Sequence, residues 1–533
     1  MPLERLYIFD TTLRDGAQTQ GVDFSVEDKR QIALALDGLG IDYVEGGWPG
    51  ANPTDTAFFA ERPPLAKARF TAFGMTKRAG RSAANDPGLS SVLDAKADAV
   101  CLVGKTWDFH VDVALEIPRG DNVDGIADSI AAVVAKKREA LFDAEHFFDG
   151  YKANREYALA CIKAAHEAGA RWIVLCDTNG GALPEEVYEI VSEVKRALPA
   201  AHLGIHAHND TEQAVAVSLA AIRGGARQVQ GTLNGLGERC GNANLCSLLP
   251  TLLLKDSYAT RFETGVGRDQ LKQLVHVSRT LDEILNRAPN RHAAYVGPSA
   301  FAHKGGLHSS AVAKDPRTYE HVPPETVGNA RKILVSDQAG RSNLLARLAE
   351  VGIDVDAKDA RIARLLDDIK QREFLGYAYD GAEASFELLA RRALGNLPEY
   401  FDVDSFRVLV EKRHNARGEL VTVSEAVVRI LVGGAVLMNV SESHNGPIDA
   451  LNHALRKDLG IYSAHLSDLR LVDYKVRILT SGTEAVTRVM VESADGKGNR
   501  WSTVGVSPNL VDASFEALMD SIRYKLFRDG ARA

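Results

Sequence analysis

The first half of the chain alternates short apolar or β-branched runs with longer stretches in which apolar residues recur at the helical period. Runs of the first kind predict buried strands, and the longer stretches predict amphipathic helices. The predicted strands are residues 6–10, 43–47, 69–73, 99–103, 139–143, 172–176, 203–208 and 228–232, and the clearest helices are 26–39, 123–137, 154–168, 184–198 and 211–224. Eight strands alternating with helices over about 250 residues predict an α/β fold, a closed (β/α)8 barrel with its chemistry on the loops that follow the strands.

Beyond residue 261 the strand pattern disappears. Helical patterns at residues 269–286, 357–373 and 382–394 flank an irregular Gly-, His-, Lys- and Pro-rich segment at 295–329. Further on, EAVVRI at 425–430 recurs as EAVTRV at 484–489, and each copy precedes a proline turn and a helical pattern, at 448–459 and 510–526. We therefore expect a barrel domain (1–260), a helical linker region (261–394) and a C-terminal α+β domain with an internal repeat (395–533).

Composition narrows the class of protein. The 533 residues are 45% hydrophobic, which is enough for a large core. Lys and Arg number 63 against 71 Asp and Glu, so a net charge of −8 argues against a nucleic-acid partner. The start MPLERLYIFD lacks the features of a secretory signal, and no window reaches the roughly 18 apolar residues of a spanning helix. Five scattered cysteines suit a reducing compartment, so we expect a cytoplasmic protein without a membrane segment.

Two histidines stand at the end of the seventh predicted strand, in LGIHAHND. His206 and His208 are two residues apart, and side chains at this spacing on a strand point to the same side. Both imidazoles can therefore reach one metal ion, although the pair alone also fits ordinary hydrogen-bonded histidines.

The first predicted strand ends in DTTLRDG, which places Arg14 and Asp15 at the same barrel mouth. Barrel closure makes strands one, seven and eight consecutive neighbours, so Asp15 should converge with the two histidines. After strand eight, GLGERCGNAN offers the amide oxygen of Asn242 on a glycine-rich path. A structural Arg and Asp pair is the alternative interpretation of DTTLRDG.

One carboxylate, two imidazoles and an amide form a mixed oxygen and nitrogen site. Such a site suits Mn²⁺, Mg²⁺, Co²⁺ or Zn²⁺ with positions left for substrate, and the ion could chelate an α-keto acid. Arg14 could stabilise the oxygen anion that develops on attack. Thr178 and Glu145 follow other strands at the same rim, where the hydroxyl could bind a substrate carboxylate and the carboxylate could move protons; helix caps or loop hydrogen bonds are the alternative.

These motifs together resemble a known family. RDG after strand one, HAHND at strand seven and GERCGNANL after strand eight are similar to the metal-dependent condensing enzymes and lyases that share a TIM barrel. FAHKGGLHSSAVAKD and the terminal repeat resemble the helical subdomain and the feedback-binding domain of the isopropylmalate, homocitrate and citramalate synthases. The resemblance covers essentially the whole chain. It implies that Asp15, His206, His208 and Asn242 hold the metal, that Arg14 polarises the keto group, and that Thr178 and Glu145 contact the keto acid.

The resemblance also bears on the catalytic base that takes a methyl proton from acetyl-CoA. Similar enzymes supply this base from the helical subdomain of the partner subunit, which points to His308, with His303 and Tyr319 nearby. His308 and His303 both remain open for the role, and a solvated loop is the plain interpretation of this segment.

Two further runs bear on the keto acid. FDAEHFFDGYKAN and SPNLVDASFEALMDSIRYKL favour, within this family, the members that condense acetyl-CoA with pyruvate and feed isoleucine synthesis. A small methyl-sized pocket is then expected. The resemblance further implies a homodimer, with isoleucine as the feedback ligand of the C-terminal domain.

Three alternatives stay under consideration. One is the leucine-pathway member, which uses 2-oxoisovalerate. Another is a retro-aldol lyase acting on a hydroxyacyl-CoA; the similar lyases end near the barrel and use a cysteine-containing loop before the GN motif, whereas here Cys240 lies inside ERCGN and a long C-terminal region follows. The third is an amino-acid sensor with an inert barrel, against which Arg14, Asp15, His206 and His208 argue together.

Overall fold

The computed structural model describes residues 2–333, 340–356, 358–414, 416–482 and 484–532. The chain forms two compact units. The first comprises Met1–Phe301 and Val322–Arg331, and the second comprises Ala302–His321 and Lys332–Ala533. The domain boundaries expected after residues 260 and 394 stay predictions.

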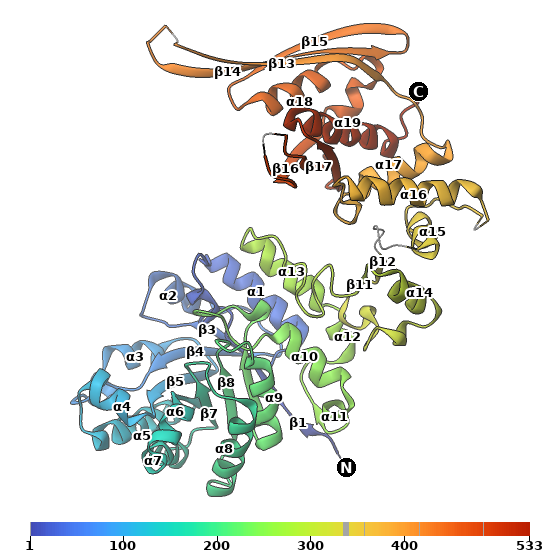
Figure 1. The fold of residues 1–533 in the computed structure, drawn as a ribbon. Coiled ribbons are helices and arrows are strands. Elements are labelled where there is room, and N and C mark those ends of the chain that lie inside the picture. Colours follow the sequence, from blue (N-terminus) through green and yellow to red (C-terminus); the bar gives the residue numbers. More distant parts are fainter. Residues whose placement is uncertain (1, 334–339, 357, 415, 483, 533) are drawn as a thin grey trace. The chain divides into compact units, whose positions relative to one another are not determined.

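The first unit is built on a closed parallel barrel (Figure 1). Its strands are β2 (Tyr7–Asp10), β3 (Tyr43–Gly47), β4 (Arg69–Met75), β5 (Ala99–Lys105), β6 (Glu139–Glu145), β7 (Trp172–Asp177), β8 (Leu203–Ala207) and β9 (Gln228–Gly231). Each strand pairs with the next, and β9 closes the barrel by pairing Tyr7 with Gln228 and Asp10 with Gly231. The eight strands and the barrel predicted from the hydrophobic pattern are confirmed.

Two layers of apolar side chains stabilise the barrel. Inward-facing residues such as Phe9, Leu141 and Trp172 fill its interior, and the other face of the strands packs against the surrounding helices. The helices are α1 (Val26–Leu39), α2 (Pro53–Ala60), α3 (Pro87–Asp94), α4 (Asp108–His110), α5 (Arg119–Ala135), α6 (Phe147–Ala153), α7 (Arg155–Glu167), α8 (Pro184–Ala197), α9 (Ala214–Gly224), α10 (Leu245–Leu254), α11 (Asp256–Ala259), α12 (Arg268–Leu271) and α13 (Leu274–Ile284). The boundaries of α1 can be predicted from its sequence, because Ser25 forms a capping box at its start and Gly40 ends the helix at φ 97°.

The second unit begins with a helical region. It contains β11 (Ala302–His303) paired with β12 (Lys332–Ile333), and the helices α14 (Gly306–Lys314), α15 (Arg341–Glu350), α16 (Ala360–Phe374) and α17 (Glu383–Leu394). The expectation of an irregular segment over residues 295–329 was wrong in part, because α14 forms within it. Helix α14 starts at Gly306, the second of two consecutive glycines, and buries Ser309 and Val312, so tertiary burial outweighs the weak local pattern. Ala357, the first residue of one predicted helix, lies outside the described residues.

The C-terminal part of this unit repeats one arrangement twice. Antiparallel strands β13 (Asp402–His414), β14 (Leu420–Val432) and β15 (Ala435–Ser443) precede helix α18 (Pro447–Lys457), and β16 (Arg470–Ile478), β17 (Thr487–Ala494) and β18 (Arg500–Ser507) precede helix α19 (Leu510–Arg528). Apolar residues of both helices share one core with both sheets. The predicted repeat of a β-rich unit with a helix is confirmed.

Short strands also occur where none was expected. Beyond residue 261 the chain adds β10 (Phe262–Glu263), which pairs with β1 (Glu4–Arg5) and fastens the N-terminal segment beside the barrel. No described helix is both long and apolar enough to cross a membrane. All five cysteines are free thiols.

Candidate metal centre and active site

Three neighbouring barrel strands deliver the predicted metal ligands to one rim. Asp15 lies in the turn after β2, His206 in β8 and His208 directly after that strand. Asn242 follows β9 and forms a backbone bridge with His208. Because β8, β9 and β2 are consecutive in the closed barrel, residues far apart in sequence meet at its carboxyl end.

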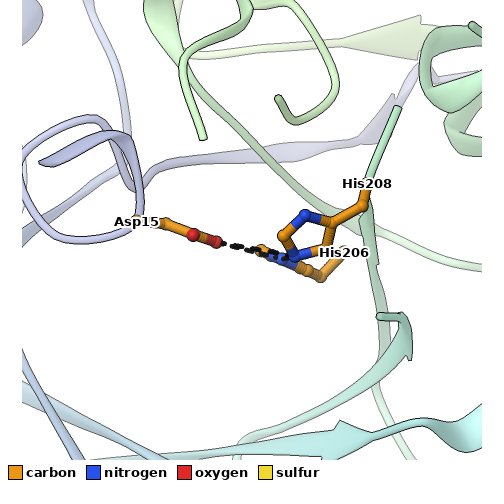
Figure 2. A group of neighbouring side chains, drawn as sticks. All are labelled: Asp15, His206 and His208. Atoms are coloured by element: carbon orange, nitrogen blue, oxygen red, sulfur yellow. Dashed lines mark hydrogen bonds and ion pairs between the residues drawn. The ribbon is translucent and has the colours of Figure 1, made fainter. Parts of the chain in front are cut away.

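The side chains of Asp15, His206 and His208 converge on one point (Figure 2). The Nε2 atoms of His206 and His208 are 3.2 Å apart, and the Asp15 Oδ2 atom lies 3.3 Å from the former and 3.9 Å from the latter. All three side chains are buried. Among the described residues they are the one group of His, Cys, Asp and Glu whose ligand atoms approach closely enough to hold a metal ion.

Asn242 completes this group with an amide. Its Nδ2 donates to Asp15 Oδ2 at 2.8 Å, while its Oδ1 is buried without a hydrogen-bond partner. The surrounding loop needs glycine, because Gly237 has φ 153° and a Cβ there would lie 2.1 Å from Asn242 Oδ1. Gly241 has φ 89° and similarly approaches the backbone of Gly235.

A glutamine on β9 orients one imidazole. Gln230 Oε1 lies 2.8 Å from Nδ1 of His206, and Gln230 Nε2 donates to Asp143 Oδ1 at 3.0 Å. Because Nδ1 of His206 donates its proton to Gln230, the lone pair on Nε2 faces the centre. Hydrogen bonds of this kind orient the imidazole ligands of metal sites. Sequence reasoning missed Gln230, although a glutamine within the short buried run QVQG was an available signal.

The electrostatics of the two histidines differ. Burial lowers the pKa of His208, and the neighbouring His206 lowers it further, to about 3. Burial also lowers the pKa of His206, but the hydrogen bond with Asp15 and the charge of Asp15 raise that pKa above its usual value. Burial alone would raise the pKa of Asp15, yet Arg14 and His206 lower it below the ordinary range. The cluster therefore contains an ionised carboxylate and a neutral imidazole.

These residues fit a divalent metal ion. The donor set is one carboxylate, two imidazoles with converging Nε2 atoms, and an amide oxygen that lacks any other partner. This mixed set matches the ligand preferences of Mn²⁺, Co²⁺, Zn²⁺ and Mg²⁺ and does not single out one of them.

Arg14 is held beside the metal ligands by a buried acid. Its Nε donates to Glu45 Oε2 at 2.7 Å, and the same oxygen accepts a hydrogen bond from Thr11 Oγ1 at 2.5 Å. The guanidinium lies over the Phe73 ring, 3.8 Å from its centre. Burial raises the pKa of Glu45, and the charge of Arg14 opposes that rise. Sequence reasoning missed Glu45 too, a carboxylate inside the fully buried strand YVEGG.

Thr178 directly follows β7, and Glu145 is the last residue of β6 at the same rim. The Thr178 hydroxyl accepts a hydrogen bond from the backbone N–H of His146 at 2.8 Å. The Glu145 carboxylate is paired with Lys105, at 2.5 Å between Oε2 and Nζ. Both predicted substrate contacts thus line the cavity above the cluster, and Lys105 joins them as a cation that was not predicted.

The cavity over the metal ligands has a volume of about 280 Å³. Trp48, Phe73, Met75 and Val103 form its apolar wall. The aromatic members of this wall are Trp48 and Phe73. Phe147, Phe148 and Tyr151 are buried in the helix-facing core, and Trp107 packs with Phe109 and His110.

The residues expected to supply the base belong to the second compact unit. His303 lies in β11, and its Nε2 is 3.1 Å from Glu320 Oε1. His308 lies in α14, is exposed, and stacks on Tyr319 with 4.1 Å between ring centres. The structure therefore brings His308 and Tyr319 together, while their approach to a barrel stays a prediction.

Comparisons with known proteins match the whole architecture. Residues 5–277 match the HMGL-like family model, residues 295–373 the homocitrate synthase post-HMGL domain-like model, and residues 380–526 the LeuA allosteric (dimerisation) domain model. The sequence is 50% identical over 530 residues to the (R)-citramalate synthase of Aquifex aeolicus, covering 99% of this chain and 98% of the relative.

Two further relatives differ in how similar their sequences are to this chain. Identity to the (R)-citramalate synthase of Geobacter sulfurreducens is 51% over 532 residues, covering 99% of this chain and 98% of the relative. Identity to a probable 2-isopropylmalate synthase of Methanopyrus kandleri is 32% over 524 residues, with coverage of 97% and 98%. The chain is thus markedly more similar to the first kind of relative than to the second.

Proposed function

The chain belongs to the (R)-citramalate synthase family, and from this premise we propose that it condenses acetyl-CoA with pyruvate and water to give citramalate and CoA. The observation that carries the proposal is identity of about one half along the entire length, which includes the barrel, the helical region and the C-terminal domain. This activity would feed isoleucine synthesis, and a cytoplasmic location is proposed with it.

The alternatives explain less of the chain. A 2-isopropylmalate synthase is supported by relatives of clearly lower identity. An HMGL-like lyase would account for residues 5–277 but leaves the two later domain matches without a role. A non-catalytic sensor would leave the buried cluster of Asp15, His206 and His208 unexplained, because burying such groups without a function is costly.

We assign the metal ligands to Asp15, His206, His208 and Asn242. A divalent ion held there would act as a Lewis acid on the keto and carboxylate oxygens of pyruvate. Asn242 both donates to Asp15 and keeps an unpartnered oxygen, so one side chain orients a ligand and supplies a donor atom.

Arg14, Thr178 and Glu145 are assigned to the keto acid. The Arg14 guanidinium is fixed by Glu45 and Phe73 and lines the cavity, so it is positioned to stabilise negative charge that develops on the keto oxygen. The Thr178 hydroxyl can donate to the substrate carboxylate while it accepts from His146. Glu145 is assigned to proton movement beside this carboxylate, with Lys105 as its fixed partner.

The base is assigned to His308 of the partner subunit. It removes a proton from the acetyl methyl group, the resulting carbanion forms a bond to the keto carbon, and the keto oxygen takes up the displaced electron pair and then a proton. Water then cleaves the thioester, releasing CoA. His308 is preferred to His303 because the His303 imidazole is paired with Glu320, whereas the His308 imidazole is exposed and stacks on Tyr319.

A keto-acid panel tests this function. Thiol release is measured with acetyl-CoA, Mn²⁺ and pyruvate, 2-oxobutanoate, 2-oxoisovalerate or 2-oxoglutarate. Pyruvate should give the highest kcat/KM, with some turnover of 2-oxobutanoate because an apolar pocket discriminates weakly against one methylene. A preference for 2-oxoisovalerate would replace this proposal with 2-isopropylmalate synthesis.

We further propose a homodimer inhibited by isoleucine. The C-terminal region matches an allosteric and dimerisation domain model. On β15, Val436, Met438 and Val440 share one exposed face, whereas Asn439 on the other face is buried toward α18. An exposed apolar sheet face of this kind supports association with a second copy. Sedimentation equilibrium should give the mass of a dimer, and Met438→Lys should shift the population to monomer.

A further inference from the structure

A buried lysine of α1 reaches the segments that carry the active-site residues. Lys29 is 3% exposed, and its ammonium donates to the carbonyl oxygens of Leu13 at 2.8 Å and of Gly46 at 2.9 Å, and to Oδ1 of Asp55. A lysine ammonium has three protons, so each of them has an acceptor. Leu13 lies in the turn after β2, Gly46 in β3 and Asp55 in α2, so one ammonium joins three separate segments to α1.

Both carbonyl groups are one residue away from the pair formed by Arg14 and Glu45. Leu13 directly precedes Arg14, and Gly46 directly follows Glu45. The guanidinium and the carboxylate meet across the same two segments, with 2.7 Å between Nε and Oε2. Because Lys29 fixes the backbone beside each of these side chains, it sets the spacing at which they pair.

Asp55 extends this connection to the wall of the cavity. Its Oδ2 accepts a hydrogen bond from the backbone N–H of Trp48 at 2.8 Å. The carboxylate lies so close to β3 that a Cβ on Gly47, which has φ 141°, would be 2.5 Å from it. The Trp48 ring meets the Phe73 ring edge to face, with 5.6 Å between their centres, and the Arg14 guanidinium lies over the same Phe73 ring. Asp55 therefore fixes the start of an aromatic wall that contacts Arg14.

Stability alone does not account for an ion pair in this place. Taking an ammonium and a carboxylate out of water is costly, and apolar residues of similar volume often stabilise a fold as well or better. The surroundings are partly aromatic, with the Lys29 ammonium 6.0 Å from the centre of the Phe58 ring. The geometry that the pair imposes on nearby backbone groups explains its presence better than a gain in stability does.

We propose that the Lys29–Asp55 pair is a positioning device for Arg14, which holds the turn after β2 and the end of β3 at the spacing that aims the guanidinium at the keto oxygen. This inference rests on the proposed condensation, in which Arg14 stabilises the developing oxygen anion. The metal ligand Asp15 has a separate backbone anchor, because its N–H donates to the carbonyl oxygen of Thr11 at 2.9 Å. Loss of Lys29 should therefore reduce turnover far more than metal affinity.

A double-mutant cycle in the full-length, Mn²⁺-loaded protein tests this role. Thiol release gives kcat for the parent, Lys29→Met, Arg14→Lys and the double variant, with the keto acid of the panel that the parent turns over fastest. Lys29→Met should lower kcat about 10- to 100-fold when Arg14 is present, but less than about twofold when residue 14 is already lysine, because Lys29 acts through the guanidinium. The dissociation constant for Mn²⁺ should stay within about twofold of the parent's, because the metal ligands keep their own contacts.

Arg5→Met is the matched control. It breaks the ion pair of Arg5 with Asp42, which directly precedes β3 and so lies at the opposite end of that strand from Gly46. This variant should lower the melting temperature and leave kcat close to that of the parent. If melting curves show that Lys29→Met is unfolded, Lys29→Met/Asp55→Leu takes its place in the cycle, because removing both charges leaves no uncompensated carboxylate.

The outcomes separate this inference from the proposed function. An equal fold-loss of kcat in both Arg14 backgrounds, or a loss of Mn²⁺ affinity as large as the loss of kcat, would overturn the positioning role of Lys29. If the parent prefers 2-oxoisovalerate, the proposed function is wrong, and the cycle run with that keto acid still decides the role of Lys29. A parent that turns over none of the four keto acids would overturn both proposals.

Discussion

The Nδ1 atom of His206 lies 2.8 Å from Oε1 of Gln230, and this contact determines which imidazole nitrogen faces the metal centre. Gln230 is itself fixed by donating to Asp143. Orientation of the ligand therefore depends on a residue that never reaches the ion, as is general for imidazole ligands.

Replacing Gln230 with leucine should weaken metal binding about 10- to 100-fold, because His206 loses the acceptor that fixes its orientation. Metal affinity is measured by titration of the metal-free protein with Mn²⁺. Gln228→Leu is the matched control: Gln228 lies two residues earlier on the same strand, is fully buried, and has neither amide atom hydrogen-bonded. Equal affinities for the two variants would contradict the role of Gln230.

Much of the barrel site could be predicted from sequence because its geometry follows from strand order. Once the eight strands are recognised, Asp15, His206 and His208 must converge. Glu45 and Gln230 could not be assigned in this way, since their contacts with Arg14 and His206 depend on side-chain directions inside the closed barrel. Helix α14 was missed because its sequence, GLHSSAVAK, follows a glycine and gives no strong helical period.

Arg14→Lys should lower kcat about 100- to 1,000-fold while metal affinity changes little. Lysine keeps the charge but loses the planar group that donates to Glu45 and lies over Phe73. Steady-state kinetics with pyruvate, combined with Mn²⁺ titration, checks this prediction. A variant with unchanged kcat would remove Arg14 from transition-state stabilisation.

Shortening the apolar wall should relax keto-acid selection. Met75 lines the cavity at the end of β4, so Met75→Ala should raise the ratio of kcat/KM for 2-oxoisovalerate to that for pyruvate about tenfold. Val134→Ala, at an exposed position on α5, is the control and should leave the ratio unchanged. The same ratio in both variants would show that another wall selects the substrate.

Stability should depend on pH through Asp10, a fully buried carboxyl group that accepts hydrogen bonds from Thr12. Burial raises the pKa of Asp10 from 3.8 to about 7. The folded protein therefore holds this proton between about pH 4 and 7, where the unfolded chain has lost it, and the free energy of unfolding falls as pH rises through that range. The loss is on the order of a few kcal/mol.

Asp10→Asn should remove this part of the pH dependence. Denaturant unfolding at pH 5 and pH 8 should show a smaller decrease for the variant than for the parent, and the exposed Asp23→Asn should behave as the parent does. An equal decrease in the parent and Asp10→Asn would mean that other groups cause the dependence.

Replacing His303 and His308 one at a time should identify the base. His308→Gln removes an exposed imidazole that stacks on Tyr319, so kcat should fall about 100-fold or more while Mn²⁺ affinity and the melting temperature stay close to those of the parent. His303→Gln breaks the pair with Glu320 and should instead lower the melting temperature. If kcat collapses in His303→Gln with stability unchanged, and His308→Gln retains full turnover, the two roles are reversed. Rates are compared at saturating acetyl-CoA, so that a weakened KM is not mistaken for a lost base.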